Sequence, residues 1–380
     1  MIVERPNLER RVLASLEAAR IPVLLGACGT GRTSTLLRLA RLLGPDRAQY
    51  LDVAAAATTP ERCLASIGGV CRFRARSSAP AAVPASARAA FDALLTFFDQ
   101  AAAPDGGPVT FLLDEFLDVR TFENFPGLRH VQRELVARLA ASSARFVLAS
   151  RFTERVHRLL RDAPATFEVI HVPSLDSEEA IALALAHDGG RRDWAASIAP
   201  AVVALTAGRA GYVNLLLDAL ASMGPASDPV AALAALFAPE GRLTARCRES
   251  YEFRLHRARG YGALKAILGV LAEDEPLNLT EISHHLRRTP GSTKDYLSWL
   301  EDVDLVTFQG KRYAFEDPLL RLFVRLYAQP VPPSDDVIVR EVGMYARPRL
   351  PSLREPVPVA ASSAKEVMLE GHGSGIIEID

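Results

Sequence analysis

The sequence predicts an α/β fold: a parallel sheet with helices on both faces, followed by a helical region and a winged helix-turn-helix. Short apolar runs alternate with helical stretches of ten to fifteen residues over residues 1–175, which is typical of a parallel sheet covered on both faces. Helical patterns then follow one another over 176–260 without intervening strands. From residue 261, three helical patterns and a hairpin with a glycine turn predict the winged helix-turn-helix.

The first region begins with a strand, a glycine-rich loop and a helix. IPVLL, residues 21–25, is a short apolar run, and leucines recur at helical spacing over 33–43. Further strands are expected at 48–56, 109–115, 145–151 and 168–175. In the second region we expect helices from Asp176 or Ser177 onward and at 192–207, 212–223, 228–238 and 250–259.

Composition and charge give no support for nucleic-acid binding, membrane insertion or secretion. The 380 residues are 49% hydrophobic and 23% charged with a net charge of −1, so no overall basic field favours nucleic acid or membranes. The longest apolar segment, 198–223, is interrupted by Arg209 and Asp218, and the charged N-terminus lacks an apolar signal. The four cysteines form no C-x-x-C pair. We therefore expect a cytoplasmic protein with reduced thiols and no membrane partner.

The stretch GACGTGRTS, residues 26–34, follows the phosphate-loop pattern G-x-x-x-x-G-K-[ST] except that Arg32 stands in the lysine position. Its glycines let backbone N–H groups point at a phosphate, to which the next helix adds positive potential. We expect Arg32 to reach the β- and γ-phosphates of ATP and Thr33 to offer its hydroxyl to Mg²⁺. The flanking strand and helix argue against a chance glycine turn. The predicted nucleotide-binding residues of this loop are Gly26, Ala27, Cys28, Gly29, Thr30, Gly31, Arg32, Thr33 and Ser34.

Two further strand ends carry polar residues. Asp114 and Glu115 end an apolar strand about 80 residues after the loop, where Asp114 would hold Mg²⁺ through water and Glu115 would polarise the attacking water. Ser150 ends the next strand and is a candidate to sense the γ-phosphate, with Arg151 beside it as a contact for phosphate or a neighbouring subunit. A polar strand end that only caps the following turn explains Ser150 equally well.

Together these motifs resemble the AAA+-related branch of P-loop ATPases, and within it the archaeal-type and STAND ATPases. The segment VERPNLERRV is similar to the adenine-contacting segment of that family, in which Arg5 matches and Pro6 departs; LTAGRAGYVNLLL (205–217) is similar to its T-G-G-x-P helix start. The resemblance covers residues 1–328. It implies ATP binding, slow hydrolysis to ADP and phosphate, and a nucleotide-controlled switch between domains. A homo-oligomer is possible, and the sequence leaves the oligomeric state undecided.

The sequence patterns divide the chain into a P-loop ATPase core (1–175), a helical lid (176–260), a winged helix domain (261–328) and a flexible tail rich in Pro and Ser (329–380). Residues 262–328 hold eight basic and ten acidic residues, which argues against DNA binding because that draws on phosphate neutralisation. The residues that could still contact DNA are Arg287, Arg288, Lys294, Lys311 and Arg312. The tail ends in GHGSGIIEID, which could add a strand to a partner protein, although disorder is the favoured interpretation.

Three functional hypotheses follow. The main one is an ATP-dependent switch with Glu115 and Arg32 as catalytic residues and an unknown protein partner. A DNA-binding regulator, or a transposition or replication accessory, is the second; a nucleotide-binding scaffold without turnover is the third. Arginine is planar and longer than lysine, so Arg32 can hold a phosphate but is poorly suited to follow a transferring phosphoryl group. We therefore expect binding to be better preserved than hydrolysis.

Overall fold

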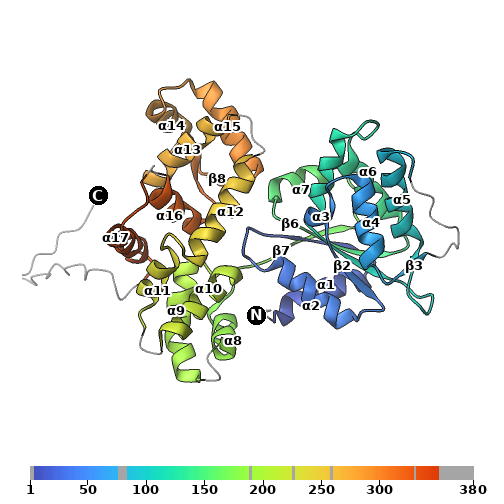
Figure 1. Ribbon diagram of the computed structural model, residues 1–380, viewed down its shortest axis with the longest axis horizontal. Helices are drawn as coiled ribbons and strands as arrows, with labels where there is room; N and C mark the ends of the chain where they lie inside the picture. The colour runs from blue at the N-terminus through green and yellow to red at the C-terminus, as the bar shows by residue number, and fades with distance from the viewer. Residues whose placement is uncertain are drawn as a thin grey trace, which may run out of the picture.

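The computed structural model describes residues 4–75, 84–187, 191–224, 227–256, 260–328 and 331–350. Within these residues the chain forms two lobes (Figure 1). An α/β lobe holds the parallel sheet, and a helical lobe contains the elements from α8 to α17. None of the helices in the described ranges has the length and apolar character needed to cross a membrane.

The α/β lobe is organised around a five-stranded sheet in which every neighbouring pair is parallel. In spatial order the strands are β2 (Ala48–Asp52), β5 (Thr110–Asp114), β6 (Arg145–Ser150), β1 (Ile21–Leu25) and β7 (Phe167–His171). All residues of β1 and β5 are buried, as expected for central strands of a covered sheet. The predicted α/β fold class is confirmed.

Helices cover both faces of this sheet, and the buried apolar side chains form two clusters. In one cluster, Leu16 of α1 and Leu39 of α2 are grouped with Leu24 of β1. In the other, Phe98 packs edge-on against Phe111 of β5. Figure 1 shows α1 and α2 on one side of the sheet and α3 to α6 on the other. The helices are α1 (Pro6–Glu17), α2 (Arg32–Leu43), α3 (Val53–Ala56), α4 (Pro60–Val70), α5 (Ala87–Gln100), η1 (Phe116–Asn124), α6 (Val131–Ala141) and α7 (Thr153–Leu160), and β3 (Arg74–Ala75) pairs with β4 (Ala101–Ala102) in a small antiparallel sheet.

One strand is shorter than the sequence predicts. The strand expected over 48–56 ends at Asp52, and α3 begins at the next residue. The Asp52 side chain accepts a hydrogen bond from the backbone N–H of Ala55 at 3.0 Å. This is the geometry of a helix N-cap, which explains why the chain turns there.

The helical lobe contains two groups of elements. The first is α8 (Ser177–His187), α9 (Arg192–Thr206), α10 (Ala210–Met223), α11 (Pro229–Leu236) and α12 (Arg242–His256). The second is α13 (Tyr261–Glu273), α14 (Leu279–His285), α15 (Pro290–Asp302), the antiparallel pair β8 (Val306–Gln309) and β9 (Arg312–Phe315), and α16 (Pro318–Tyr327). The helix expected over 250–259 starts earlier, at Arg242. Its buried face recurs every four residues and consists of Leu243, Cys247, Tyr251 and Leu255.

The prediction of a flexible tail from residue 329 is wrong for part of that range. Helix α17 (Asp335–Ala346) contacts α11 and α16, and it buries Ile338, Val342 and Ala346. The Tyr345 hydroxyl donates a hydrogen bond to the Leu205 carbonyl oxygen at 2.8 Å. The buried residues are spaced four apart, so an apolar stripe is present but narrow. Residues 351–380, including GHGSGIIEID, lie outside the described residues.

Candidate functional site

The glycine loop joins β1 to α2 and has the backbone conformation that only glycine adopts easily. Gly29 and Gly31 have φ of 86° and 98°, and Gly31 is the left-handed residue immediately before α2. The Thr30 hydroxyl donates to the Ala27 carbonyl oxygen at 2.9 Å, which holds the loop closed. The loop therefore leads directly into the first turn of α2, whose backbone N–H groups have no partner within the helix and can bind an anion.

Arg32 is turned inward. Only 8% of its surface is exposed, its Nη2 lies 2.8 Å from Glu115 Oε1, and its Nη1 donates to the Gly26 carbonyl oxygen. Both ends of the guanidinium are thus engaged by the protein. This arrangement could not be predicted from the loop sequence, because Glu115 is 83 residues away.

Asp114 and Thr33 are in direct contact. Thr33 Oγ1 donates to Asp114 Oδ2 at 2.6 Å, and the Tyr50 hydroxyl donates to the same oxygen at 3.1 Å. Asp114 Oδ1 is buried and has no hydrogen-bond partner among the described residues. Burial raises the pKa of Asp114, while the bond from Thr33 opposes the rise. A buried carboxylate oxygen without a partner, beside a hydroxyl, fits the oxygen ligands that Mg²⁺ takes.

Glu115 lies between two arginines. Its Oε1 is 3.1 Å from Arg151 Nε as well as 2.8 Å from Arg32 Nη2, and its Oε2 accepts from the Arg151 backbone N–H at 3.0 Å. Burial acts to lower the pKa of Arg151, but the charge and hydrogen bond of Glu115, together with the charge of Asp118, outweigh it and raise that pKa. Glu115 itself has φ of 51°, a left-handed conformation uncommon for a residue with a side chain. The strand end is therefore shaped to present this carboxylate.

A cavity of about 460 Å³, here called the loop cavity, opens over the glycine loop. Residues 27–34 line it with Glu115 and Arg151, and α10 and α12 close the opposite side. Arg242 and Arg246 of α12 reach this cavity, and neither is among the residues predicted from the sequence. Their spacing of four residues places both on one helix face, which is the signal that could have identified them. The lining holds four arginines and two acids and is net cationic.

Three predicted nucleotide contacts, Arg5, Gly26 and Ser150, do not line the loop cavity. Arg5 is 4% exposed; it donates to the Pro173 carbonyl oxygen at 2.7 Å and pairs with Glu179 at 3.1 Å. Ser150 is fully buried, and its Oγ accepts from the Phe152 N–H at 3.1 Å. The turn-capping alternative therefore describes the position of Ser150.

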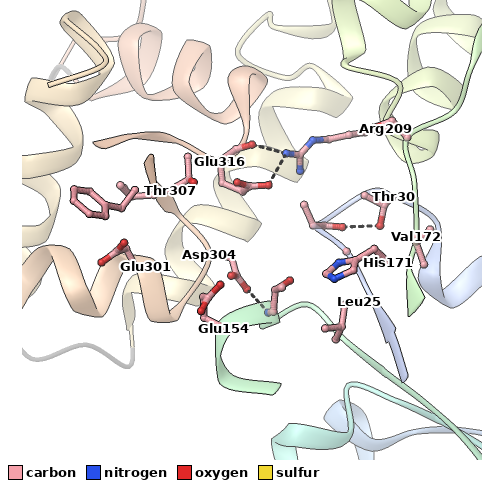
Figure 2. Close-up of a pocket in the computed structure, with 16 residues that line it drawn as sticks. Leu25, Thr30, Glu154, His171, Val172, Arg209, Glu301, Asp304, Thr307 and Glu316 are labelled. Carbon is pink, nitrogen blue, oxygen red and sulfur yellow. Dashed lines mark hydrogen bonds and ion pairs between the residues drawn. The ribbon is translucent and has the colours of Figure 1, made fainter. Parts of the chain in front are cut away.

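Figure 2 shows a second cavity, of about 380 Å³, on the other side of the loop. It shares Ala27 and Thr30 with the loop cavity and includes Gly26. Its carboxylates come from α7, α15 and the segments flanking the β8–β9 pair, and His171 and Arg209 lie across from them. The carboxylates are those of Glu154, Glu301, Asp304 and Glu316. This excess of acids disfavours a polyphosphate, so the loop cavity is the better phosphate site and the second is called the acidic cavity below.

Arg209 joins the loop to the helical lobe. Its Nη1 donates to the Cys28 carbonyl oxygen at 3.1 Å, and its Nη2 donates to the Glu316 carbonyl oxygen at 2.6 Å. The same guanidinium lies 3.3 Å from Asp317 Oδ2. The Gly211 N–H also donates to the Gly29 carbonyl oxygen at 2.7 Å. The loop backbone is thus hydrogen-bonded directly to the start of α10.

The five basic residues considered for DNA contact are all exposed. Arg312 donates to the Pro276 carbonyl oxygen at 2.7 Å and pairs with Glu281 at 3.3 Å. The Arg288 guanidinium lies over the ring of Tyr296, 5.7 Å from its centroid. The basic set is therefore partly engaged within its own region of the chain.

Neither a protein-family profile nor a curated protein matches the sequence. Among solved structures, the chain is similar to a Walker-type ATPase of Pyrococcus abyssi, with a TM-score of 0.63 and 15% identity over 85% of this chain and 96% of that chain. A STAND protein with a tetratricopeptide repeat sensor from Pyrococcus horikoshii matches with a TM-score of 0.36 and 16% identity, over 92% of this chain and 45% of that chain. The second score is too low to carry an argument. The sheet order, the loop geometry and the first similarity together show that the chain has the fold of a P-loop ATPase.

Proposed function

We propose that this chain is an ATP-dependent molecular switch that binds ATP with Mg²⁺ in the loop cavity. The observation that carries the proposal is the contact of Thr33 with Asp114 at 2.6 Å, with the second Asp114 oxygen buried and without a partner among the described residues. This pair lies beside Arg32, Glu115 and the N-terminus of α2. The arrangement suits a metal-bound phosphate chain.

Each residue then has a defined role. Loop N–H groups hold the phosphates, and Arg246 adds a cation from α12. Thr33 and Asp114 would hold Mg²⁺, which supplies charge neutralisation on the phosphate oxygens. Glu115 would orient water once its carboxylate is released from Arg32 and Arg151, which engage it in this structure.

The ion pair between Arg32 and Glu115 explains why we expect slow hydrolysis. A carboxylate that accepts from two guanidinium groups is a poor acceptor for the proton of water. Phosphates entering the loop cavity would compete for Arg32 and release Glu115. If Arg32 stays on Glu115, the chain is a non-hydrolysing nucleotide scaffold, which is the second candidate that this ion pair favours.

The switch would act through Arg209 and Gly211, because both bind loop carbonyl oxygens and both belong to the helical lobe. A change in loop conformation on ATP binding would therefore alter how α10 and the proposed winged helix domain sit on the core. The output is a protein partner, a second copy included. DNA as the partner is disfavoured by the acidic balance of residues 262–328.

Isothermal titration calorimetry of Asp114→Asn tests the proposal. The amide removes one negative charge and keeps the shape, so we expect Mg²⁺-dependent ATP affinity to fall by about 100-fold, the size of a lost buried charge contact. Asp52→Asn is the matched control, because Asp52 ends the neighbouring strand in register with Asp114 but accepts from the Ala55 N–H, whereas Asp114 accepts from Thr33. Equal ATP affinity in wild type and Asp114→Asn would overturn the proposed metal site.

Phosphate release by Glu115→Gln separates the switch from the scaffold. A slow ATPase should lose about 100-fold or more of its rate when the water-orienting carboxylate is removed. Equal and near-zero rates in wild type and Glu115→Gln would favour the scaffold. ATP binding measured on both proteins shows that each retains its loop.

A further inference from the structure

A third cavity lies between the two lobes, behind the strand end that carries Arg151. It encloses about 560 Å³, within the range of roughly 300–1,000 Å³ typical of small-molecule sites. η1 and α7 line it from the α/β lobe, and α12 and α15 line it from the helical lobe. Figure 1 shows α7 on the side of the α/β lobe that faces α12 and α15. None of the residues assigned above to the phosphates or Mg²⁺ lines this cavity, which is called the interlobe cavity below.

The lining is cationic. Arg120, Arg155 and Arg254 line the interlobe cavity with one acid, Asp118. Arg254 is buried and donates to the Asp304 carbonyl oxygen at 3.0 Å. Among the described residues, neither Arg120 nor Arg155 makes a hydrogen bond or ion pair.

Arg155 is held in an unfavourable setting for a cation. Burial and the nearby charge of Arg120 lower the pKa of Arg155, while Asp302 and Asp304 act in the opposite direction. Arg155 is half-buried and Arg120 is exposed, so an anion placed between the two guanidinium groups would offset their repulsion. The interlobe cavity therefore favours a ligand with a negative group such as a phosphate.

Three aromatic rings contribute to the same lining. Phe152, Phe253 and Trp299 border the interlobe cavity, and the Arg155 guanidinium lies 4.8 Å from the Phe152 ring centroid. Phe253 exposes 38% of its surface, a large fraction for an apolar ring. Aromatic faces beside arginines are suited to stack a planar ring that carries an anionic group.

We propose that the interlobe cavity is a second ligand site that binds a small phosphorylated ligand with a planar ring, a nucleotide, separately from the phosphate loop. The phosphate would lie between Arg120 and Arg155, and the ring against Trp299 and Phe253. The proposal goes beyond the proposed switch and does not depend on ATP binding at the loop.

Arg151 connects the interlobe cavity to Glu115. The Arg151 guanidinium lies 5.1 Å from the Phe253 ring centroid, and the same side chain is the ion-pair partner of Glu115. Arg151 and Phe152 thus form the wall between the loop cavity and the interlobe cavity. A ligand that stacks on Phe253 would change the packing of Arg151, and it would also hold the two lobes together.

Adenosine monophosphate in EDTA is the probe, because it has a ring and one phosphate and needs no metal. The chain has two tryptophans, so a Trp194→Phe background makes Trp299 the only tryptophan reporter. We expect a saturable change in Trp299 fluorescence that Arg155→Ala weakens about ten-fold, as loss of one charge-assisted contact does. Arg155→Lys should restore part of the affinity. Arg161→Ala is the matched control, since Arg161 follows the same helix and lies outside the interlobe cavity.

Inorganic phosphate and adenosine, titrated in parallel, separate the contributions of the phosphate and the ring; both should bind more weakly than the monophosphate. No change in Trp299 fluorescence at millimolar monophosphate would overturn the proposal. So would an unchanged affinity in the Arg120→Ala/Arg155→Ala double variant. Urea unfolding of each variant shows that a lost signal does not come from a lost fold.

Discussion

The two cavities that meet at the phosphate loop carry opposite charge. Four arginines dominate the loop cavity, which faces α10 and α12, whereas four carboxylates gather in the acidic cavity, which faces β8 and α15. One backbone loop contributes to both. The loop alone therefore does not set the charge on its two sides. The helical lobe adds Arg242 and Arg246 to one side, and it adds three of the four carboxylates to the other. On the acidic side the same lobe is attached to the loop through Arg209.

Arg209→Ala removes the side chain that attaches the loop to the helical lobe, and we expect the largest effect from this variant. It leaves Asp317, only 4% exposed, without its cation and frees the Cys28 and Glu316 carbonyl oxygens. We expect the free energy of unfolding in urea to fall by about 3 to 5 kcal/mol, as when a buried pair loses one partner.

The control for this variant is Arg242→Ala, which removes an ion pair to Asp218 on the other side of the loop. The Arg242 side chain is 61% exposed, so its loss should cost below about 1 kcal/mol of unfolding free energy. Equal losses in the two variants would contradict the assignment of Arg209 as the attachment.

Asp304→Asn tests whether a carboxylate of the acidic cavity makes the stability of the protein depend on pH. Burial raises the pKa of Asp304 to about 7 from an ordinary 3.8, with Arg254 and the Thr153 N–H opposing the rise and Glu316 and Glu154 adding to it. The folded protein therefore binds this proton more tightly than the unfolded chain. Its contribution to stability falls as pH rises from about 4 to about 7 and stays lost above that.

The asparagine variant has no such proton and still offers an acceptor to Thr153. We expect it to be more stable than wild type at pH 8 by about 2 kcal/mol, and the advantage to vanish near pH 4. Urea unfolding at both pH values measures this. A difference between the two proteins that is the same at pH 4 and pH 8 would show that folding does not shift the pKa of Asp304.

Arg246→Ala tests whether the cations of α12 contribute to ATP binding in the loop cavity. This exposed arginine lines the loop cavity from α12, so we expect its removal to weaken ATP binding about ten-fold, the effect of one charge-assisted hydrogen bond. Arg248→Ala is its matched control, because Arg248 is exposed on the same helix and does not line the loop cavity. Calorimetry that finds both variants equal to wild type would exclude α12 from phosphate binding.

Local sequence patterns are sufficient for the centre of the α/β lobe. The apolar run before Gly26, the glycines and the leucines after Thr33 each point to one element, and the structure has all three. A helix that buries only a narrow apolar stripe is harder to predict from its sequence. Helix α17 is an example: it has three buried residues among charged neighbours and therefore resembles a tail in sequence. The start of α12 escapes prediction because its apolar residues are separated by arginines.

Side-chain partners are less accessible to prediction than elements. Tyr50 belongs to a neighbouring strand and reaches Asp114 only because β2 and β5 pair in register. Arg5 matches a nucleotide-contacting segment in sequence, yet Glu179 and the Pro173 carbonyl oxygen bind it in the structure. Each of these contacts depends on the packing of distant segments, which no local pattern encodes.

Two features follow from local sequence alone: a glycine-rich phosphate loop after the first strand, and two acids at the end of a neighbouring strand. Parallel strands place their carboxyl ends at one edge of a sheet, so these residues had to meet. Tertiary packing brings Arg32 to Glu115 and Arg209 to the loop, and it sets a cationic cavity on one side of the loop and an acidic one on the other. Arg32 lies 83 positions from Glu115 and Arg209 lies 181 positions from Cys28, and over such separations charge and burial in the folded chain select the partner.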